Sequence, residues 1–190
     1  MLTSRDISIL RHVNEHGLIT IQQAYKLFFN NAKYGQDLSW KRLKYLAEAG
    51  QLKYASLKNS VTREYVYYTG KIPSTHKLYL MNFYANLKFS GADIKMFGRE
   101  SVFGDIRSDG ACIFNYKDNT VFCLVEIAIT NQPDYSKYES LKADGWLQKE
   151  YGAFPFIVVI SDFPQRYKGN KLSVKYLNFD MADFSRVILP

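Results

Sequence analysis

Residues 37–70, DLSWKRLKYLAEAGQLKYASLKNSVTREYVYYTG, carry the clearest structural pattern in this 190-residue chain. The first half predicts a helix, because four apolar residues recur at the spacing of helical turns and form one face: Trp40, Leu43, Leu46 and Ala47. Asp37 or Ser39 is expected to cap the N-terminus of this helix, and Gly50 is expected to end it.

The opposite face of this predicted helix is basic and aromatic. Each residue turns a helix by about 100°, so Lys41 and Tyr45 lie roughly opposite Leu43, and Arg42 and Lys44 flank them. These side chains have no core to pack against. We therefore expect them to face solvent or a binding partner.

The second half of the stretch predicts a β-hairpin, because every second residue in two short segments alternates with polar neighbours. These residues are Leu52, Tyr54 and Ser56, then Glu64, Val66 and Tyr68. The turn between them is polar and contains Lys58, Asn59 and Arg63. A helix followed directly by a hairpin with a basic tip is typical of a winged helix-turn-helix, which places the helix in the major groove of DNA. The predicted DNA-binding residues are Ser39, Lys41, Arg42, Lys44, Tyr45, Lys58, Asn59 and Arg63.

Two further helices are predicted upstream of this stretch. Thr3 or Ser4 is expected to cap the first, and Gly17 to end it. A short extended link follows, and Thr20 is expected to cap a second helix over residues 21–29. Three helices and a hairpin make a complete winged-helix domain, so we assign residues 1–72 to a DNA-binding domain.

The charge of the chain is concentrated in this segment. The whole sequence has a formal net charge of +7. Residues 1–72 hold eleven Lys and Arg against five Asp and Glu, whereas the remainder holds fourteen against thirteen. A basic patch confined to one domain indicates a polyanionic partner, and together with the predicted fold it favours double-stranded DNA over a merely solubilising surface charge.

Several classes of protein are disfavoured by the composition. Cys112 and Cys123 lie in apolar runs and are expected to be buried thiols, not a disulfide or a metal site. The three histidines, His12, His16 and His76, are scattered and are expected at the surface or in capping positions. We therefore expect no metal and no cofactor. No signal peptide or membrane span is evident, which predicts a cytoplasmic protein without a membrane partner.

The remaining chain predicts a helix followed by an α/β layer. Residues 73–94 are assigned to a linker helix that runs to about Phe89, and residues 95–190 to a second domain, which makes the chain a two-domain α+β protein. Strands are expected at residues 96–99, 106–107, 111–116, 121–129 and 156–160, with edge strands at 172–177 and 187–189. A helix is expected over residues 133–148.

Two acidic residues of the second domain invite a chemical interpretation. Asp109 precedes a predicted strand, and Glu126 lies inside an otherwise apolar one, where a charge needs a reason. This pattern resembles the restriction-endonuclease-like superfamily, in which such an Asp and a Glu-x-Lys motif hold a divalent metal. The lysine position is occupied by Ala128, which implies a degenerate site without catalytic residues; if the protein were a nuclease, Asp109 and Glu126 would be its catalytic pair.

Cations elsewhere leave two alternatives open for this pair. Lys137 or Lys142, on the following helix, would have to replace the missing lysine in an active nuclease. In a purely structural role, Glu126 would instead be a buried acid paired with Lys137 or Arg107.

From residue 3 to about residue 160 the chain also resembles the replication-relaxation family of Gram-positive plasmids and mobile elements. The matching motifs are Arg42-Leu43-x-x-Leu46 with Ala49-Gly50, then Thr75-His76, Asp109, and Phe122-x-x-x-Glu126 before Lys137-Tyr138. That family places a winged helix before a degenerate nuclease-like domain.

The resemblance implies a non-enzymatic, double-stranded-DNA-binding accessory protein in replication, relaxation or transfer, or in their control. Other replication or transfer proteins would be its further partners, and a homodimer is left open. Two alternatives are a metal-dependent DNA nuclease, and a transcription regulator whose second domain senses a ligand or mediates dimerisation.

Overall fold

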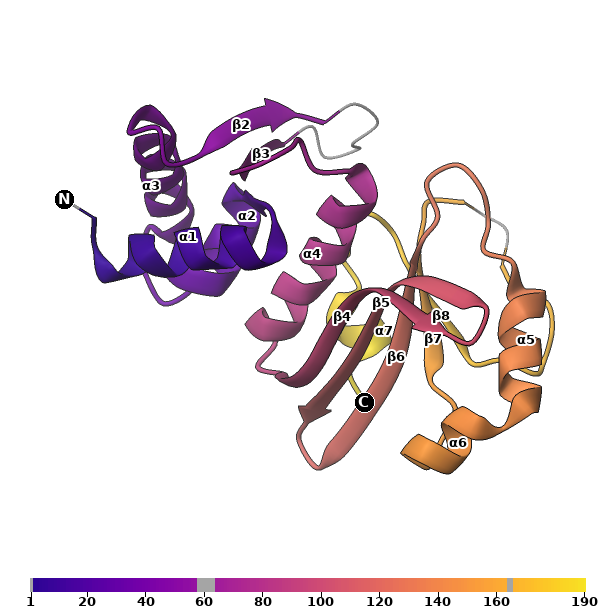
Figure 1. Ribbon diagram of the computed structural model, residues 1–190. Helices are drawn as coiled ribbons and strands as arrows, with labels where there is room; N and C mark the ends of the chain where they lie inside the picture. Colours follow the sequence, from indigo (N-terminus) through magenta and orange to yellow (C-terminus); the bar gives the residue numbers. More distant parts are fainter. Residues whose placement is uncertain (1, 58–63, 164–165) are drawn as a thin grey trace. The chain divides into compact units, whose positions relative to one another are not determined.

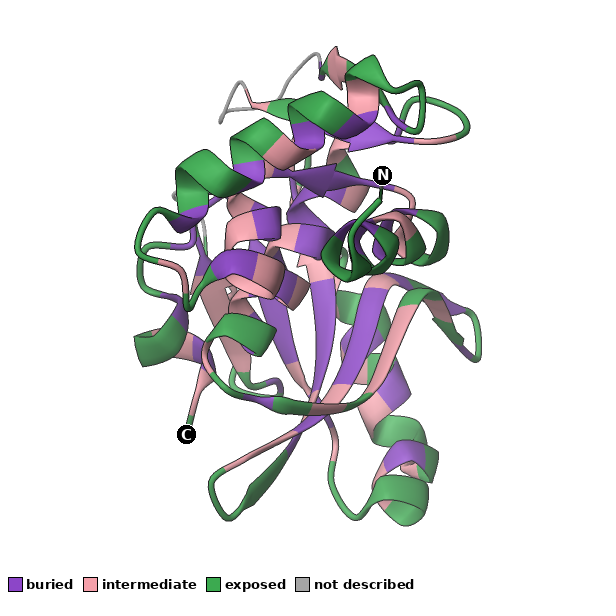
Figure 2. Cartoon of the chain, turned by 90° about the vertical axis from the view of Figure 1, so that its left-hand side faces the viewer, coloured by how far each residue is buried: buried purple, intermediate pink, exposed green. Residues whose placement is uncertain are grey.

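The computed structural model describes residues 2–57, 64–163 and 166–190 of a mixed α/β protein with two open sheets. The chain divides into two compact units, Met1–Phe89 and Ser90–Pro190 (Figure 1). The helices Ser4–His16 and Gly35–Glu48 carry buried residues on one side and exposed residues on the other, the helix Thr75–Phe89 is buried or half-buried over most of its length, and the central strands of the larger sheet are largely buried (Figure 2). Within the described ranges, none of the helices combines the length and the apolar character needed to cross a membrane.

The first unit contains helices and short strands in an alternating order. They are α1 (Ser4–His16), β1 (Ile19–Thr20), α2 (Ile21–Ala24), the π-helical turn η1 (Tyr25–Phe29), α3 (Gly35–Glu48), β2 (Lys53–Ser56), β3 (Tyr65–Tyr68) and α4 (Thr75–Phe89). One cluster of buried side chains joins these elements: Ile9, Val13, Ile19, Ala24, Phe29, Leu43, Leu46, Leu52 and Tyr67.

Local hydrogen bonds explain where the first two helices begin and end. The hydroxyl of Thr3 accepts from Asp6 N at 3.2 Å, and Asp6 Oδ2 accepts from Thr3 N at 2.6 Å, which satisfies two backbone donors at the start of α1. Thr20 and Gln23 form the same reciprocal pair at α2. Gly17 ends α1 in the left-handed conformation, φ +85°. The predicted Thr3 and Thr20 caps and the Gly17 terminus are confirmed.

Helix α3 begins earlier than the sequence predicts. Its first residue is Gly35 and its N-cap is Tyr34, which makes no side-chain capping bond, so neither Asp37 nor Ser39 is the cap. A Cβ at Gly35 would lie 2.3 Å from the carbonyl oxygen of Phe29, so the absence of a side chain allows α3 to start close against η1. At the other end, Gly50 follows the helix in the left-handed conformation, as expected.

The predicted hairpin is part of a three-stranded antiparallel sheet with the order β1-β3-β2. Tyr54 pairs with Tyr67 in the hairpin, and Thr20 pairs with Val66 at the other edge of β3. The segment Ile19–Thr20, predicted only as an extended link, is therefore a short strand.

Helix α4 belongs with the first unit, whose boundary falls at Phe89. Gln23 Nε2 donates to Asn82 Oδ1 at 2.6 Å, and Lys26 Nζ donates to Asn86 Oδ1 at 2.9 Å. These two bonds tie α4 to α2 and η1. The helix has the bounds expected for the predicted linker helix, but it is an integral part of the N-terminal unit.

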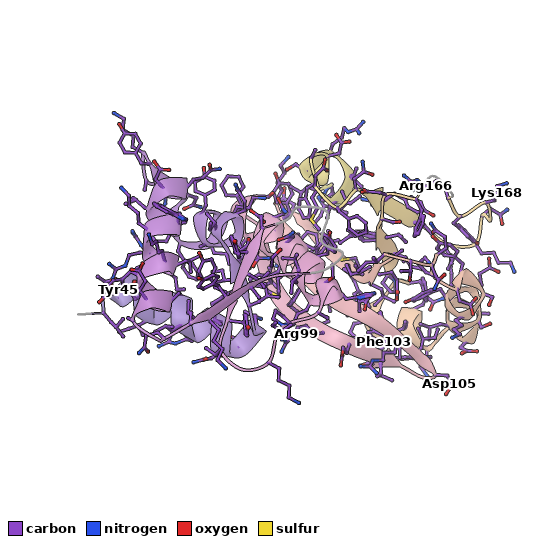
Figure 3. The ribbon with its side chains drawn as sticks, turned by 90° about the horizontal axis from the view of Figure 1, so that it is seen from above. Tyr45, Arg99, Phe103, Asp105, Arg166 and Lys168 are labelled. Carbon is purple, nitrogen blue, oxygen red and sulfur yellow. The ribbon has the colours of Figure 1, made fainter. Side chains whose placement is uncertain are left out.

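The second unit is built on a five-stranded sheet with the order β4-β5-β6-β7-β8. Its elements are β4 (Asp93–Phe103), β5 (Ile106–Tyr116), β6 (Asn119–Ile127), α5 (Tyr135–Asp144), α6 (Trp146–Tyr151), β7 (Phe156–Ile160), β8 (Val174–Leu177) and α7 (Phe184–Ile188). The first three strands are antiparallel, and β7 and β8 run parallel to β6 after the helical crossover. Phe103 and Asp105 mark the tip of the β4–β5 hairpin (Figure 3).

Three sequence predictions for this unit need correction. The helix predicted over residues 133–148 is divided into α5 and α6, because Gly145 adopts a left-handed conformation with φ +74°. Residues 106–116 form one continuous strand, since Gly110 stays in register with Val125. Residues 187–189 are not an edge strand, because α7 includes the first two of them.

One ion pair connects helices α1 and α3 of the N-terminal unit. Arg42 of α3 donates through Nε to Asp6 Oδ1 at 2.7 Å and through its terminal nitrogen to Asp6 Oδ2. The Asp6 carboxylate is completely buried, and hydrogen bonding by Arg42 is the largest cause that lowers its pKa from 3.8 to about 2.

We predict that Arg42→Ala lowers the free energy of unfolding of the first unit by about 2 kcal/mol, because it leaves a buried carboxylate without its cation. The value lies below the roughly 3–5 kcal/mol of a fully buried pair, since the Arg42 side chain is 30% exposed. Urea denaturation at pH 7, followed by Trp40 fluorescence in a Trp146→Phe background, measures the change. Because the folded pKa of Asp6 is depressed, this contribution is present above pH 3.8 and is lost as the pH falls towards about 2.

The matched control is Lys44→Ala. Lys44 lies 3.8 Å from Glu48 in an exposed pair one turn apart, which contributes about 0.5 kcal/mol or less. Equal losses for the two variants would show that the Asp6–Arg42 pair does not hold α1 to α3.

Candidate nucleic-acid interface and carboxylate pair

The outer face of α3 carries exposed cationic and aromatic side chains. Lys41, Lys44 and Tyr45 are exposed, whereas Leu43 and Leu46 on the inner face are completely buried. Figure 3 labels Tyr45 on this helix. The core side therefore anchors α3, and the opposite side presents long flexible cations beside an aromatic ring.

Trp40 belongs to this outer face and not to the apolar face predicted for it. Its side chain is 45% exposed, and Lys44 Nζ lies 5.4 Å from the centre of its ring. The Arg42 guanidinium likewise lies 4.6 Å from the centre of the Tyr45 ring. Such cation–π contacts hold the exposed side chains in defined positions at little energetic gain.

The structure separates two predicted DNA-binding residues from this exposed face. Ser39 is completely buried, and its hydroxyl donates to Gly35 O at 2.7 Å, so it is not accessible to a partner. Arg42 is committed to Asp6, so its main contacts are structural. A small polar residue inside a helix often bonds the carbonyl four positions earlier, which explains the inward position of Ser39.

The remaining predicted contacts were assigned to the turn of the predicted hairpin. Lys58, Asn59 and Arg63 lie outside the residues that the structure describes. Tyr54 and Tyr65, on the paired strands β2 and β3, are 61% and 52% exposed, and their ring centres lie 5.6 Å apart in an edge-to-face arrangement. The prediction overlooked this aromatic pair, although the alternation of the hairpin already placed Tyr54 on one face.

The second unit brings Asp109 and Glu126 together. Gly110 pairs with Val125, so the next step of the antiparallel ladder sets Asp109 of β5 beside Glu126 of β6. Asp109 Oδ2 accepts from Ile127 N at 2.8 Å. The sequence therefore identified two carboxylates that are neighbours in the fold.

A phenol, and not a cation, is the hydrogen-bond partner of Glu126. Tyr138 of α5 donates its hydroxyl proton to Glu126 Oε1. Burial is the largest cause that raises the pKa of Glu126 from 4.5 to about 7; Tyr138 opposes the increase, and the charge of Asp109 adds to it. Burial and the adjacent carboxyl also raise the pKa of Tyr138. The sequence motif included Tyr138 next to Lys137, but it did not predict the bond of Tyr138 to Glu126.

The cations considered for this pair have other partners. Lys137 lies 4.0 Å from Asp134, and Arg107 lies 2.6 Å from Glu100. Lys142 donates to the carbonyl of Lys171. The expectation that Lys137 or Arg107 pairs with a buried Glu126 is therefore wrong.

These residues do not fit a catalytic metal. One carboxylate accepts from a phenol, the other accepts from the backbone, and Ala128 at the usual lysine position is buried and donates its N–H to Ile160 O. Among the described residues, no three His, Cys, Asp or Glu side chains are grouped to hold a metal ion. Both observations disfavour Mg²⁺ at this pair, because that ion prefers several ionised oxygen ligands.

Comparison with protein-family models, with curated proteins and with solved structures found no match to this chain.

We predict that Glu126→Gln raises the free energy of unfolding of the second unit at pH 8 by about 1–2 kcal/mol. The pKa of Glu126 is about 7 in the folded chain and 4.5 in the unfolded chain. Its carboxyl therefore stabilises the fold below pH 4.5, and this stabilisation is lost as the pH rises through 7. Gln removes the cost of the buried charge, although its new N–H groups offset part of the gain. Denaturation at pH 4.5 and pH 8, followed by Trp146 fluorescence in a Trp40→Phe background, measures the difference.

Glu139→Gln is the matched control on α5. Its carboxylate accepts from Tyr167 at 2.6 Å and from Lys171 at 2.9 Å, and these bonds lower its pKa, so neutralisation at pH 8 should bring no gain. A Glu126→Gln variant that is no more stable than wild type at pH 8 would contradict the raised pKa.

Proposed function

We propose that this chain is a double-stranded-DNA-binding protein whose N-terminal unit is a winged helix-turn-helix with α3 as its recognition helix. The observation that carries the proposal is the two-sided character of α3, which is anchored by Leu43 and Leu46 and exposes Lys41, Lys44 and Tyr45 outward. The order of three helices with a three-stranded β1-β3-β2 sheet supports the same assignment.

The distribution of charge supports a polyanionic partner for this unit. Residues 1–89 hold thirteen Lys and Arg against five Asp and Glu, whereas residues 90–190 hold twelve against thirteen. The first unit thus has a formal charge of +8, and the second has −1. Counterion release from the DNA would make binding by such a unit strongly dependent on salt.

In this proposal the residues of α3 divide into contacting and positioning groups. Lys41 and Tyr45 contact base edges or nearby phosphates in the major groove, and Lys44 contacts the backbone. Arg42 holds the helix against α1 through Asp6. Tyr54 and Tyr65, on the hairpin strands, offer flat surfaces that pack on the sugar–phosphate backbone beside the groove.

We further propose that the second unit is a degenerate nuclease-like domain that serves as an interaction or dimerisation platform. Three antiparallel strands, a helical crossover and two parallel strands support this assignment, together with the adjacent Asp109 and Glu126. The chain would then act as an accessory factor in replication, relaxation or transfer of a mobile element, or in their control.

We predict that Lys41→Ala and Tyr45→Ala in the full-length chain weaken binding to the specific duplex more than to random duplex. A base-edge contact carries roughly 1–3 kcal/mol of discrimination, whereas a phosphate contact weakens all sequences alike. Selection of a preferred site from a random duplex library, followed by anisotropy titrations over a range of salt concentrations, provides both affinities. Each lost phosphate contact should lower the log–log salt slope by about 0.9.

Arg11→Ala is the control that loses the same charge as Lys41→Ala. Arg11 is exposed on α1, outside the proposed recognition helix, so the variant should bind with nearly the affinity of wild type. Equal losses for all three variants on specific and random duplex would refute α3 as the recognition helix. If residues 90–190 alone bound duplex DNA, the DNA interface would lie in the second unit, and its assignment to the first unit would be wrong.

The adjacency of Asp109 and Glu126 is the one observation that favours a second function, metal-dependent DNA cleavage. We predict no nicking of supercoiled plasmid with Mg²⁺ or Mn²⁺, because Ala128 supplies no cation for the reacting phosphate and Glu126 is held by Tyr138. Nicking by wild type that disappears in a stably folded Glu126→Gln variant would overturn the non-enzymatic assignment.

A further inference from the structure

A cavity of about 340 Å³ lies within the first unit, lined by side chains of α1, η1 and α4. The polar and aromatic groups that matter at its wall are His12, Glu15, His16, Lys26, Tyr84 and Lys88. None of these belongs to the outer face of α3. The cavity is therefore separate from the proposed DNA interface and does not depend on that proposal.

Two histidines of one helix meet at this cavity. His12 and His16 are one turn apart on α1, and their ring centres lie 4.6 Å apart with the planes inclined by 53°. His12 is 8% exposed, and the His16 side chain is 12% exposed. The expectation of a surface or capping position is therefore wrong for His12, whereas His16 is the partly buried last residue of α1.

The His12 ring contains a buried nitrogen that lacks a partner. Within the described residues, Nε2 of His12 is shielded from solvent and forms no hydrogen bond. Such groups are uncommon in folded proteins, and a bound ion or water is one way to satisfy them. The Tyr84 ring, whose centre lies 6.0 Å from that of His12 and 5.0 Å from that of His16, encloses both imidazoles on the α4 side.

We propose that His12 and His16 form a binding site for a transition-metal ion of the class that prefers imidazole ligands, such as Zn²⁺, Ni²⁺ or Cu²⁺. Two histidines at positions i and i+4 of a helix direct their rings to one side and can share an ion. Among the described residues, no group of three His, Cys, Asp or Glu side chains is arranged to hold a metal ion, so water completes the coordination. The affinity is accordingly that of a two-ligand site and not of a structural zinc centre.

The charges around the cavity are compatible with a cation. Glu15 Oε1 lies 3.7 Å from His16 Nε2 and supplies a negative charge at the rim. Lys26 donates to Asn86, and burial lowers the pKa of its ammonium group. Lys88 is exposed and can turn its flexible side chain towards solvent. An anion held by the two lysines is the competing occupant.

The test is calorimetric titration of the untagged full-length chain with Zn²⁺ and Ni²⁺, with Mg²⁺ as the oxygen-preferring control ion. We expect saturable binding of one Zn²⁺ or Ni²⁺ per chain and none of Mg²⁺, reversed by EDTA. Loss of a residue that only supports a metal ligand lowers affinity roughly 10–100-fold, so His12→Gln and His16→Gln should each lower it by at least that much. His16→Gln keeps the test decisive if the buried His12 variant fails to fold.

His76→Gln is the matched control, because His76 is an exposed histidine near the start of α4 and should leave metal affinity unchanged. Retained affinity in His16→Gln, or a loss in His76→Gln of equal size, would overturn the site. Absence of saturable metal binding up to millimolar concentration would also overturn it. A parallel titration with inorganic phosphate that saturates while the metals do not would assign the cavity to an anion instead.

Discussion

The buried carboxylate of Asp6 is the constraint on which the N-terminal unit depends. It accepts from the backbone of Thr3, which fixes the first turn of α1, and it also receives the guanidinium of Arg42 from α3. One side chain therefore sets both where α1 begins and how α3 is rotated about its axis. With Arg42 turned towards Asp6, the neighbouring Lys41 and Lys44 are directed outward. The Asp6–Arg42 pair thus determines which side chains of α3 are exposed.

A different arrangement fixes the second unit, where the α5 side of the sheet combines apolar packing with a polar row. Glu126 pairs in register with Val159, and Val159 with Tyr176, so these residues occupy one row across three parallel strands. Tyr138 reaches this row from α5, and the hydroxyls of Tyr135 and Tyr176 lie 3.1 Å apart. The Tyr138 phenol donates to the carboxyl of Glu126 without adding charge and stabilises its ionised form, whereas burial of the carboxyl favours the neutral form and is the larger effect.

Patterns within a single element could be predicted from the sequence. The apolar repeat of Leu43 and Leu46 in α3, the Thr3 and Thr20 caps, and the glycines Gly17 and Gly50 after α1 and α3 depend on neighbours a few residues away. The start of α3 could not be predicted, because it depends on how closely Gly35 approaches Phe29 O. Neither could the break at Gly145, since an apolar repeat continues through it.

Contacts between distant segments account for most of what the sequence concealed at the candidate sites. Asp109 and Glu126 were recognisable because a charge in an apolar strand is unusual, but the Tyr138 partner comes from another element. Arg42 has the composition of a DNA contact, and only its bond to Asp6, 36 positions away, reveals a structural role. His12 and His16 are four residues apart, yet their burial beneath Tyr84 depends on the packing of α4.

The two side-chain hydrogen bonds that Asn82 and Asn86 of α4 accept have a mechanical consequence. Gln23 and Lys26 are three positions apart, and their acceptors Asn82 and Asn86 are four positions apart. The two donors are therefore separated by about one helical turn, and so are the two acceptors. A helix held only by apolar contacts can slide or rotate by small steps at little cost. Here a shift of α4 by a fraction of a turn would break both hydrogen bonds together, so α4 packs in a single position. The place and direction at which the backbone leaves the first unit at Phe89 are thereby set by two side-chain pairs.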